Sequence, residues 1–254
     1  MTITAIDFDR LARFEREVHL RSGAGAGANG TIDVCLVQAA DWLSGGAGKS
    51  DAPECVDPVI RRLGIWLNDS SRFEEWRDEL KPFAARIVGT NVGREMTTRR
   101  AYLCADWAVR TIAPMAMDAY GKAPKLAQRM RDVPEIVDKA TSLAGRKIAR
   151  EATKELRAAA AAYATTAAAA AAAAAAAYAT ADATADAYAT ADATADATAD
   201  AADAYAAAYA TAADDAAAAA AAADAAAARR TLWDESLQLL DRLIRVTEPA
   251  AIAS

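Results

Sequence analysis

The sequence predicts an all-α protein: a compact multi-helix head followed by a long Ala-rich helical tail that is either extended or folded back on itself. Three observations support this fold class. Residues 158–228 are almost entirely Ala, with only Thr, Asp and Tyr besides. No Gly or Pro occurs between Gly145 and Pro249 to interrupt a helix. Before this stretch, apolar residues recur at the three- and four-residue steps of a helix.

The head begins with two predicted helices joined by a flexible segment. A helix over residues 5–20 places Leu11, Phe14 and Val18 on one face. The sequence SGAGAGANG (22–30) follows, with too little side chain to pack, and is typical of a linker or loop. A second helical stripe runs from Ile32 to Leu43.

The sequence SGGAGKS (44–50) is similar to the phosphate-binding pattern GxxxxGK[ST]. It departs from that pattern at three points. Leu43 stands where the first Gly is required, the preceding element is helical rather than a strand, and Asp51-Ala52-Pro53 replaces the start of the phosphate-binding helix. We therefore predict a Gly-rich turn and no nucleotide cofactor.

Helix-start and helix-breaking residues mark the next elements. Asp57 followed by Pro58 predicts a cap and a first turn. Ser71 with Glu74 predicts a capping box for a further helix, which Pro82 kinks or splits. Residues 91–93 are then expected to form a turn.

The rest of the head is predicted to be helical as well. A helix from Glu95 to Ala113 should end or bend at Pro114, and two shorter pieces should surround Pro124. Glu135 is expected to begin the helix that runs into the tail. Four Trp residues are placed to build the core of the head: Trp42, Trp66, Trp76 and Trp107.

Asp and Thr are predicted to occupy opposite faces of the tail. Residues 177–201 alternate Ala with other types, a period of two that fits a strand, but Ala and Asp are depleted in sheets. On a helical projection one half is acidic, with Asp182, Asp186, Asp192, Asp196, Asp200, Asp203, Asp214, Asp215 and Asp224. The other half carries Thr180, Thr184, Thr190, Thr194 and Thr198 among Ala.

Several functions fit such a helix. The acidic face keeps an Ala-rich rod soluble, or it binds a basic partner as a mimic of nucleic acid. The Thr/Ala face could bind ice, although Thr recurs here at four and six residues rather than at eleven. A membrane span over residues 158–181 is disfavoured, because Ala is nearly neutral on insertion scales and no Leu or Ile adds driving force.

The C-terminal segment is predicted to be amphipathic and to dock on the head or on another chain. Burial of Leu and Trp stabilises by about 1.5–3 kcal/mol per side chain, far more than an Ala methyl does. The predicted docking residues are Leu232, Trp233, Leu237, Leu240, Leu243 and Ile244.

Charge and the reactive side chains exclude several classes of site. Residues 1–157 carry 25 basic and 22 acidic side chains, too small an excess for nucleic-acid binding even with Arg99, Arg100 and Arg110 in the head. Three Cys residues, widely spaced, predict buried thiols rather than disulfides, and His19 is expected to be a surface or half-buried polar residue. No spacing predicts a metal site. The polar N-terminus lacks a signal peptide, so a cytoplasmic location is expected.

Three motifs of the head, followed by the Ala-rich tail, carry a resemblance: SDAPECVDPVIRRL (50–63), WLND (66–69) and RAYLCADWAVRTIAP (100–114). The chain resembles a group of uncharacterised bacterial and bacteriophage-associated proteins, whose tails are Ala punctuated by Tyr, Trp, Asp and Arg at steps near four. The resemblance covers most of the chain and implies neither an activity nor catalytic residues. Varied punctuation among relatives favours a tail that supplies geometry rather than acidity.

Together these patterns predict a non-enzymatic structural or interaction protein. Its parts are a head (1–133), a long helix with the low-complexity region (134–228), and an amphipathic C-terminal segment (229–254). The tail is expected to mediate self-association as a homo-oligomer, or to bind a protein partner, without cofactor or small-molecule substrate. The alternatives are an acidic decoy for a nucleic-acid-binding protein and an ice-binding helix.

Overall fold

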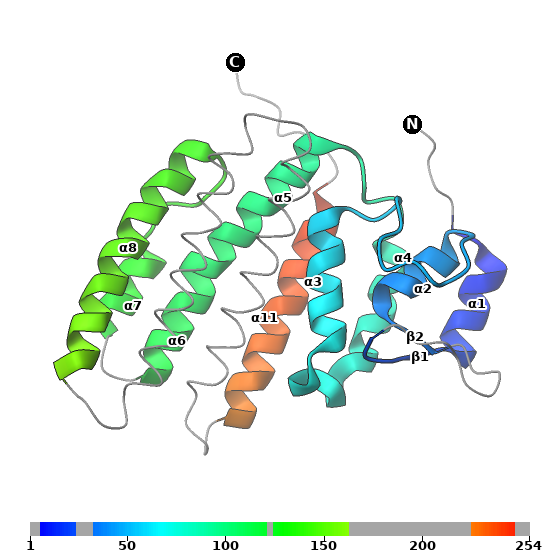
Figure 1. The fold of residues 1–254 in the computed structure, drawn as a ribbon, viewed down its shortest axis with the longest axis horizontal. Coiled ribbons are helices and arrows are strands. Elements are labelled where there is room, and N and C mark those ends of the chain that lie inside the picture. Colours follow the sequence, from blue (N-terminus) through cyan, green and yellow to red (C-terminus); the bar gives the residue numbers. More distant parts are fainter. Residues whose placement is uncertain (1–5, 24–32, 121–123, 163–224, 247–254) are drawn as a thin grey trace. The chain divides into compact units, whose positions relative to one another are not determined.

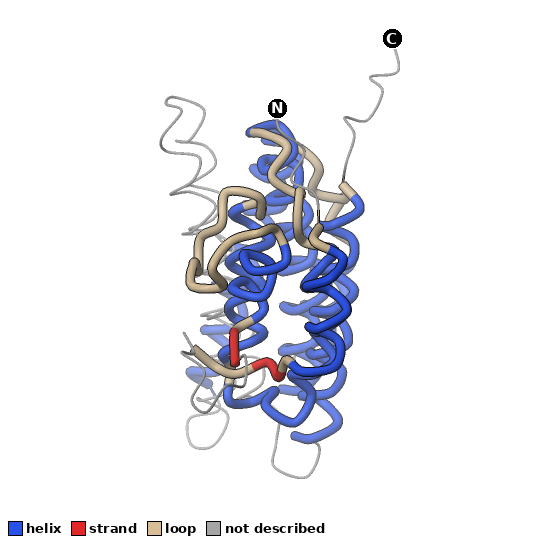
Figure 2. Tube along the Cα trace, turned by 90° about the vertical axis from the view of Figure 1, so that its right-hand side faces the viewer, coloured by secondary structure: helices blue, strands red, loops and turns tan. Residues whose placement is uncertain are grey.

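Helices form nearly all of the regular structure in the computed structural model, which describes residues 6–23, 33–120, 124–162 and 225–246. Figure 2 shows them in blue, with one short pair of strands in red. The all-α class predicted from the sequence is confirmed. The chain divides into two compact units, residues 1–97 with 240–254, and residues 98–239.

The first unit is built from short helices, and α2 contacts α1, α3 and α4 (Figure 1). A parallel pair of two-residue strands joins the segments on either side of residues 24–32. In chain order its elements are α1 (Phe8–Glu17), β1 (His19–Leu20), β2 (Asp33–Val34), α2 (Leu36–Leu43), α3 (Pro58–Asp69), the 3₁₀ helix η1 (Ser71–Leu80), α4 (Lys81–Arg86), the beginning of α5 (Arg94–Trp107) and the end of α11 (Ala225–Arg245).

Helix α1 is shorter at both ends than the predicted 5–20. Asp7 caps it by accepting the backbone N–H groups of Asp9 and Arg10, each at 3.0 Å. At the other end Val18 is extended, and the two residues after it pair with β2. Pairing with a distant segment, which local periodicity cannot reveal, ends the helix early.

The core of the first unit lies between α2 and α3. Leu36, Leu43 and Ile60 are fully buried there. Gly64 lets the two helices approach closely, since a Cβ at that position would lie 3.1 Å from Leu36 Cδ2. The predicted start of α3 is confirmed, because buried Asp57 accepts the N–H groups of the first turn and Pro58 follows it.

The predicted capping box at Ser71 is wrong. Ser71 already lies inside the first turn of η1, Ser70 is the N-cap residue, and no side chain caps the helix. The segment is a 3₁₀ helix rather than an α-helix. Pro82 does split the helical run as predicted, because η1 ends at Leu80 and α4 begins at Lys81. Pro is tolerated in the first turn of a helix, where its missing N–H is not needed.

The second unit continues α5 through a π-helical turn, η2 (Ala108–Ile112), into α6 (Ala113–Tyr120), and then has α7 (Pro124–Arg131), α8 (Lys139–Ala162) and most of α11. The sequence predicts that Pro114 ends or bends the helix; in the structure α5 ends at Trp107, the π turn η2 follows, and Pro114 lies in the first turn of α6. The wider turn of η2 lies directly before Pro114, which cannot donate a backbone hydrogen bond. A local π turn therefore accommodates the Pro without ending the helical path.

Helix α8 begins at Lys139 rather than at the predicted Glu135. Ile136 donates its N–H to the carboxylate of Asp106 at 3.0 Å, which holds this part of the chain outside the helix. Asp138 then caps α8 by accepting the N–H of Thr141 at 2.8 Å. The N–H and the hydroxyl of Thr141 both donate to the Asp138 carboxylate and lower its pKa.

The four Trp residues do not all enter the core as predicted. Trp107 is buried, whereas Trp42, Trp66 and Trp76 are half-buried. Aliphatic residues from α2, α3 and α4 fill the core of the first unit instead. Trp66 packs edge-on against buried Phe73, with ring centroids 5.5 Å apart, so it covers the core from the side.

Candidate functional site

The Gly-rich loop after α2 binds a carboxylate of its own chain. The Oδ2 atom of Asp41 accepts the backbone N–H groups of Gly48 at 2.8 Å, Lys49 at 3.2 Å and Ser50 at 3.5 Å. Consecutive N–H groups aimed at one anion are the device by which phosphate loops hold nucleotides. In this loop the anion is internal, and the predicted Gly-rich turn after a helix agrees with the structure.

Two glycines make this arrangement possible. A Cβ on Gly46 would lie 2.4 Å from the Oδ1 atom of Asp41, so only Gly fits beside the carboxylate. Gly48 has a φ of 70°, which favours Gly, and packs on the side chain of Trp42. The Gly residues that suggested a phosphate loop in the sequence therefore serve the contact with Asp41.

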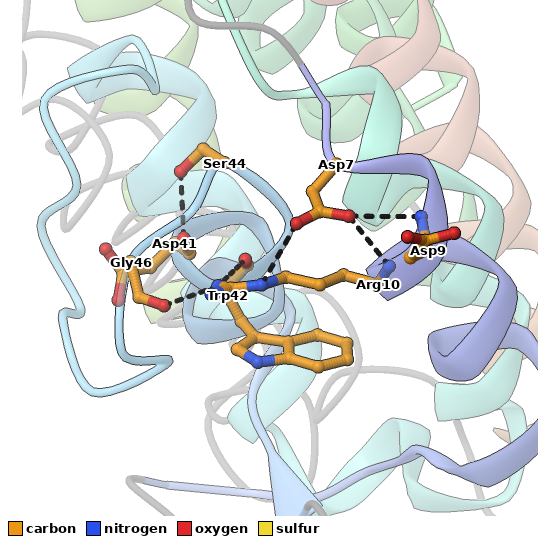
Figure 3. A network of polar contacts seen from close by, with 7 residues as sticks. All are labelled: Asp7, Asp9, Arg10, Asp41, Trp42, Ser44 and Gly46. Atoms are coloured by element: carbon orange, nitrogen blue, oxygen red, sulfur yellow. Dashed lines mark hydrogen bonds and ion pairs between the residues drawn. The ribbon is translucent and has the colours of Figure 1, made fainter.

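Arg10 fastens α1 to the same loop (Figure 3). Its Nη1 atom donates to the carbonyl oxygens of Trp42 and Gly46, both at 2.7 Å. Asp7 forms an ion pair with Arg10 at 3.4 Å and donates its own N–H to the Leu43 carbonyl. The hydrogen bonds shown in Figure 3 thus hold the C-terminal end of α2 against the N-terminal end of α1.

The ring of Trp42 also holds α1 and α2 together, because two Arg side chains of α1 lie over it. The guanidinium carbons of Arg10 and Arg13 lie 5.6 Å and 5.7 Å from the Trp42 ring centroid, within the range of cation–π attraction. Sequence reasoning missed the roles of Asp7, Arg10 and Asp41. Only the Asp7–Arg10 spacing along one helix carried a signal, and it did not point to the loop.

The reactive side chains of the head have structural surroundings. Cys35 caps α2 with its thiol, and burial raises the pKa of that thiol. Cys104 is also buried, Cys55 is half-buried, and none of the three forms a disulfide. His19 is exposed in β1, as predicted. The described residues contain no cluster of His, Cys, Asp and Glu suited to a metal ion.

The Arg cluster of the head is not arranged for phosphate contact. Arg100 is fully buried, and Arg99 and Arg110 are half-buried. Arg110 donates from Nη1 to the carboxylate of Asp106 at 3.0 Å, the same carboxylate that binds Ile136. Three nearby Arg in the sequence are therefore not three exposed cations.

The predicted docking residues lie on α11. Leu232, Trp233, Leu240 and Leu243 are buried, while Leu237 and Ile244 are half-buried. Asp241 forms an ion pair with Arg86 of α4, and that hydrogen bond lowers the pKa of the Asp241 carboxyl. The end of α11 is thus tied to α4 within the first unit.

The two predicted faces of the tail lie outside the described residues. This holds for all nine Asp of the acidic face, from Asp182 to Asp224, and for the Thr face from Thr180 to Thr198. It also holds for most of the stretch weighed as a membrane span. Among the helices that the structure describes, none is both long and apolar enough to cross a bilayer.

Comparison with family models, with curated proteins and with solved structures gave no match.

Proposed function

We propose that this chain is a non-enzymatic structural or interaction protein whose Ala-rich tail mediates self-association or binds a protein partner. One observation carries the proposal: the Ala-rich stretch begins inside α8 and ends inside α11. Helix α8 ends at Ala162, within the first five residues of the Ala-rich stretch (158–162), and α11 begins at Ala225, near its end. The low-complexity region therefore joins two helices of the fold.

Both of these helices are anchored. A Cβ on Gly145 of α8 would lie 3.0 Å from Ile136 Cδ1, so the helix packs closely on the segment before it. On α11, Trp233 is fully buried and Asp241 is tied to Arg86. Because both helices are held by the fold, the Ala-rich region between them has a defined start and a defined end from which to contact a partner.

The Gly-rich loop supports the same proposal. Its N–H groups already bind Asp41, so a nucleotide phosphate would have to displace a carboxylate held by three hydrogen bonds. The loop serves as an internal fastening between α1 and α2.

Oligomeric state measured together with molecular dimensions tests the proposal. We expect light scattering on the full chain to give a mass above the 26.5 kDa of one chain, or to do so once a partner is added. Small-angle X-ray scattering on the same sample distinguishes a side-by-side oligomer from an elongated one. A monomer at every concentration, with no partner recovered from cells and specific turnover of a small molecule, would contradict it.

The acidic decoy is the second candidate, favoured by nine Asp and no Lys or Arg in residues 158–228. Replacement of those nine Asp by Asn distinguishes the two. A decoy loses its nucleic-acid-binding partner, whereas a scaffold mainly loses solubility. An ice-binding helix would show thermal hysteresis that disappears when Thr184 and Thr194 are replaced by bulky residues.

A further inference from the structure

The 3₁₀ helix η1 is unusually long for its type. It runs for 10 residues, from Ser71 to Leu80, whereas 3₁₀ helices of more than three or four residues are uncommon because their hydrogen bonds have poorer geometry. The hydrogen bonds at its two ends have the three-residue spacing. Phe73 donates its N–H to the Ser70 carbonyl at 3.2 Å, and Lys81 donates its N–H to the Asp78 carbonyl.

Pro82 accounts for the last turn of η1 alone. An α-helix would require residue 82 to donate an N–H to the carbonyl of Asp78, four residues earlier, and Pro has no N–H. Lys81 donates to that carbonyl instead. This effect does not reach the turns before Asp78, so a second cause must hold them in the 3₁₀ form.

The apolar residues and the cap of the segment have the pattern of an α-helix. Phe73, Trp76 and Leu80 recur at steps of three and four residues, so they share one face at about 100° per residue. At the roughly 120° per residue of a 3₁₀ helix, Leu80 lies about 120° away from Phe73. Ser71 with Glu74 would cap an α-helix, yet no side chain caps η1.

The charges of the segment favour the 3₁₀ form. Side chains three residues apart eclipse one another in a 3₁₀ helix, whereas an α-helix also brings side chains four residues apart together. At the three-residue step most pairs have opposite charges: Arg72–Glu75, Glu74–Arg77 and Asp78–Lys81, against Glu75–Asp78. At the four-residue step every charged pair within residues 71–81 has like charges: Glu74–Asp78, Glu75–Glu79 and Arg77–Lys81. An α-helix would therefore bring three repelling pairs together.

The length of η1 sets the position of α4. The rise per residue is about 2.0 Å in a 3₁₀ helix and about 1.5 Å in an α-helix, so conversion of the whole of η1 would shorten it by about 5 Å. The body of η1 is fixed to α3, because Arg77 Nε donates to the Asn68 carbonyl at 2.7 Å and Phe73 is buried. The shortening would thus fall on α4, whose Arg86 forms the ion pair with Asp241 of α11.

We propose that η1 is a two-state element, which its charges hold as a 3₁₀ helix and which draws α4 away from Asp241 when it converts to an α-helix. The cap and the apolar face of the α form are present in the sequence, and the four-residue charge pairs oppose it. Segments with two packings close in free energy are one basis of conformational switching. The contact that breaks is an anchor of α11. The inference does not depend on the proposed function, since it concerns the first unit alone.

Two substitutions in the full-length chain test the role of charge. Glu75→Lys makes the pair with Glu79 attractive, and Lys81→Glu makes the pair with Arg77 attractive. The net charge of the chain moves in opposite directions in these two variants and is unchanged in the double variant E75K/K81E. As a matched control, K125E/E135K makes the same exchange on two exposed residues of the second unit.

Nuclear Overhauser contacts measured on the isotopically labelled chain report the helix type. Contacts from Hα to the amide hydrogen two residues ahead mark a 3₁₀ helix, and contacts to the amide hydrogen four residues ahead mark an α-helix. We expect the wild type and K125E/E135K to show the 3₁₀ contacts in residues 71–80. Each single substitution should raise the ratio of α to 3₁₀ form by about 2–5-fold, and E75K/K81E should raise it by about tenfold.

Thermal unfolding measures the link to α11. Arg86→Met removes the ion pair with Asp241 and should lower the melting temperature of the wild type. In E75K/K81E the α form already separates α4 from Asp241, so the same substitution should lower the melting temperature by less than half as much. In K125E/E135K the effect of Arg86→Met should equal that in the wild type.

Three results would overturn the inference. Persistent 3₁₀ contacts in E75K/K81E would show that charge does not select the helix type. Opposite shifts in the two single variants would trace the effect to net charge. An equal effect of Arg86→Met in both backgrounds would show that α4 stays on α11. Circular dichroism checks that each variant is folded, and if the double variant does not fold, the two single variants decide the role of charge.

These outcomes are separate from those of the proposed function. Failure of all three measurements leaves self-association or partner binding by the tail untouched. Conversely, a chain that stays monomeric and binds no partner, yet shows the expected shifts in η1, would remove the proposed function and leave this inference standing.

Discussion

Replacing Asp41 by Ala should destabilise the Gly-rich loop more than any other single loss of charge in that region. The carboxylate accepts three backbone N–H groups, at 2.8, 3.2 and 3.5 Å. Hydrogen bonds to a charged group are each worth about 1.5–3 kcal/mol when buried. Asp41 is half-buried, and water can reach part of the loop, so we expect a total loss of about 2 kcal/mol.

Urea denaturation of the full chain measures this loss. With a slope of about 2 kcal/mol per M, the midpoint should fall by about 1 M. Asp51→Ala is the matched control, because it removes the same charge from an exposed residue of the same loop. Its midpoint should move by less than about 0.2 M, since exposed charges contribute little.

A second measurement tests the geometry of the loop rather than its stability. In Asp41→Ala the three N–H groups lose their internal anion, so sulfate should raise the melting temperature of this variant more than that of the wild type at equal ionic strength. Equal midpoints for Asp41→Ala and Asp51→Ala, together with no added response to sulfate, would refute the assigned role of Asp41.

Three further predictions concern contacts within one or the other of the two units. Asp57→Ala removes the side chain that caps α3 and accepts the Thr97 hydroxyl at 2.7 Å, so the free energy of unfolding should fall by about 2–4 kcal/mol. Asp57→Asn should recover at least half of this loss. An Asp57→Ala variant as stable as the wild type would contradict this reasoning. Arg86→Met removes the ion pair with Asp241, so the free energy of unfolding should fall by about 0.5–1 kcal/mol at neutral pH. Because Arg86 lowers the pKa of folded Asp241, this contribution is complete above the unfolded Asp pKa of about 4 and is lost as pH falls through the lower folded value. The difference in the free energy of unfolding between the wild type and Arg86→Met should therefore shrink towards zero near about pH 2. A difference that does not depend on pH would exclude the ion pair as its cause. Gly145→Val should cost about 1–3 kcal/mol by thermal unfolding, because the added atoms meet Ile136 at 3.0 Å, and an unchanged melting temperature would show that α8 does not pack there.

Local signals in the sequence predicted the helices but only some of their boundaries. Asp57-Pro58 succeeded because a cap and a first-turn Pro act within a few residues. Ser71 with Glu74 has the same kind of local logic and failed, since the chain enters η1 one residue earlier. The start of α8 failed because Ile136 is bound by Asp106, 30 residues away in sequence.

The candidate site shows the same division. The departures from a phosphate loop, above all Leu43 and the helix before it, were visible in the sequence. The Asp41 contact was not, because it requires the loop to fold back on the last turns of α2. Arg10 was equally invisible, since its acceptors lie 32 and 36 residues further along the chain.

By itself the sequence determined the helical class, the position of the Ala-rich region and the character of the Gly-rich loop. These follow from backbone propensity, side-chain period and the presence or absence of Gly and Pro, all of which act over one or two turns. The tertiary structure alone decided which charges are exposed. It buries Arg100 and binds Glu151 and Glu155 to Arg129, while Lys147 and Lys154 remain exposed on α8. Exposure depends on what packs against a side chain, and those neighbours come from distant parts of the chain.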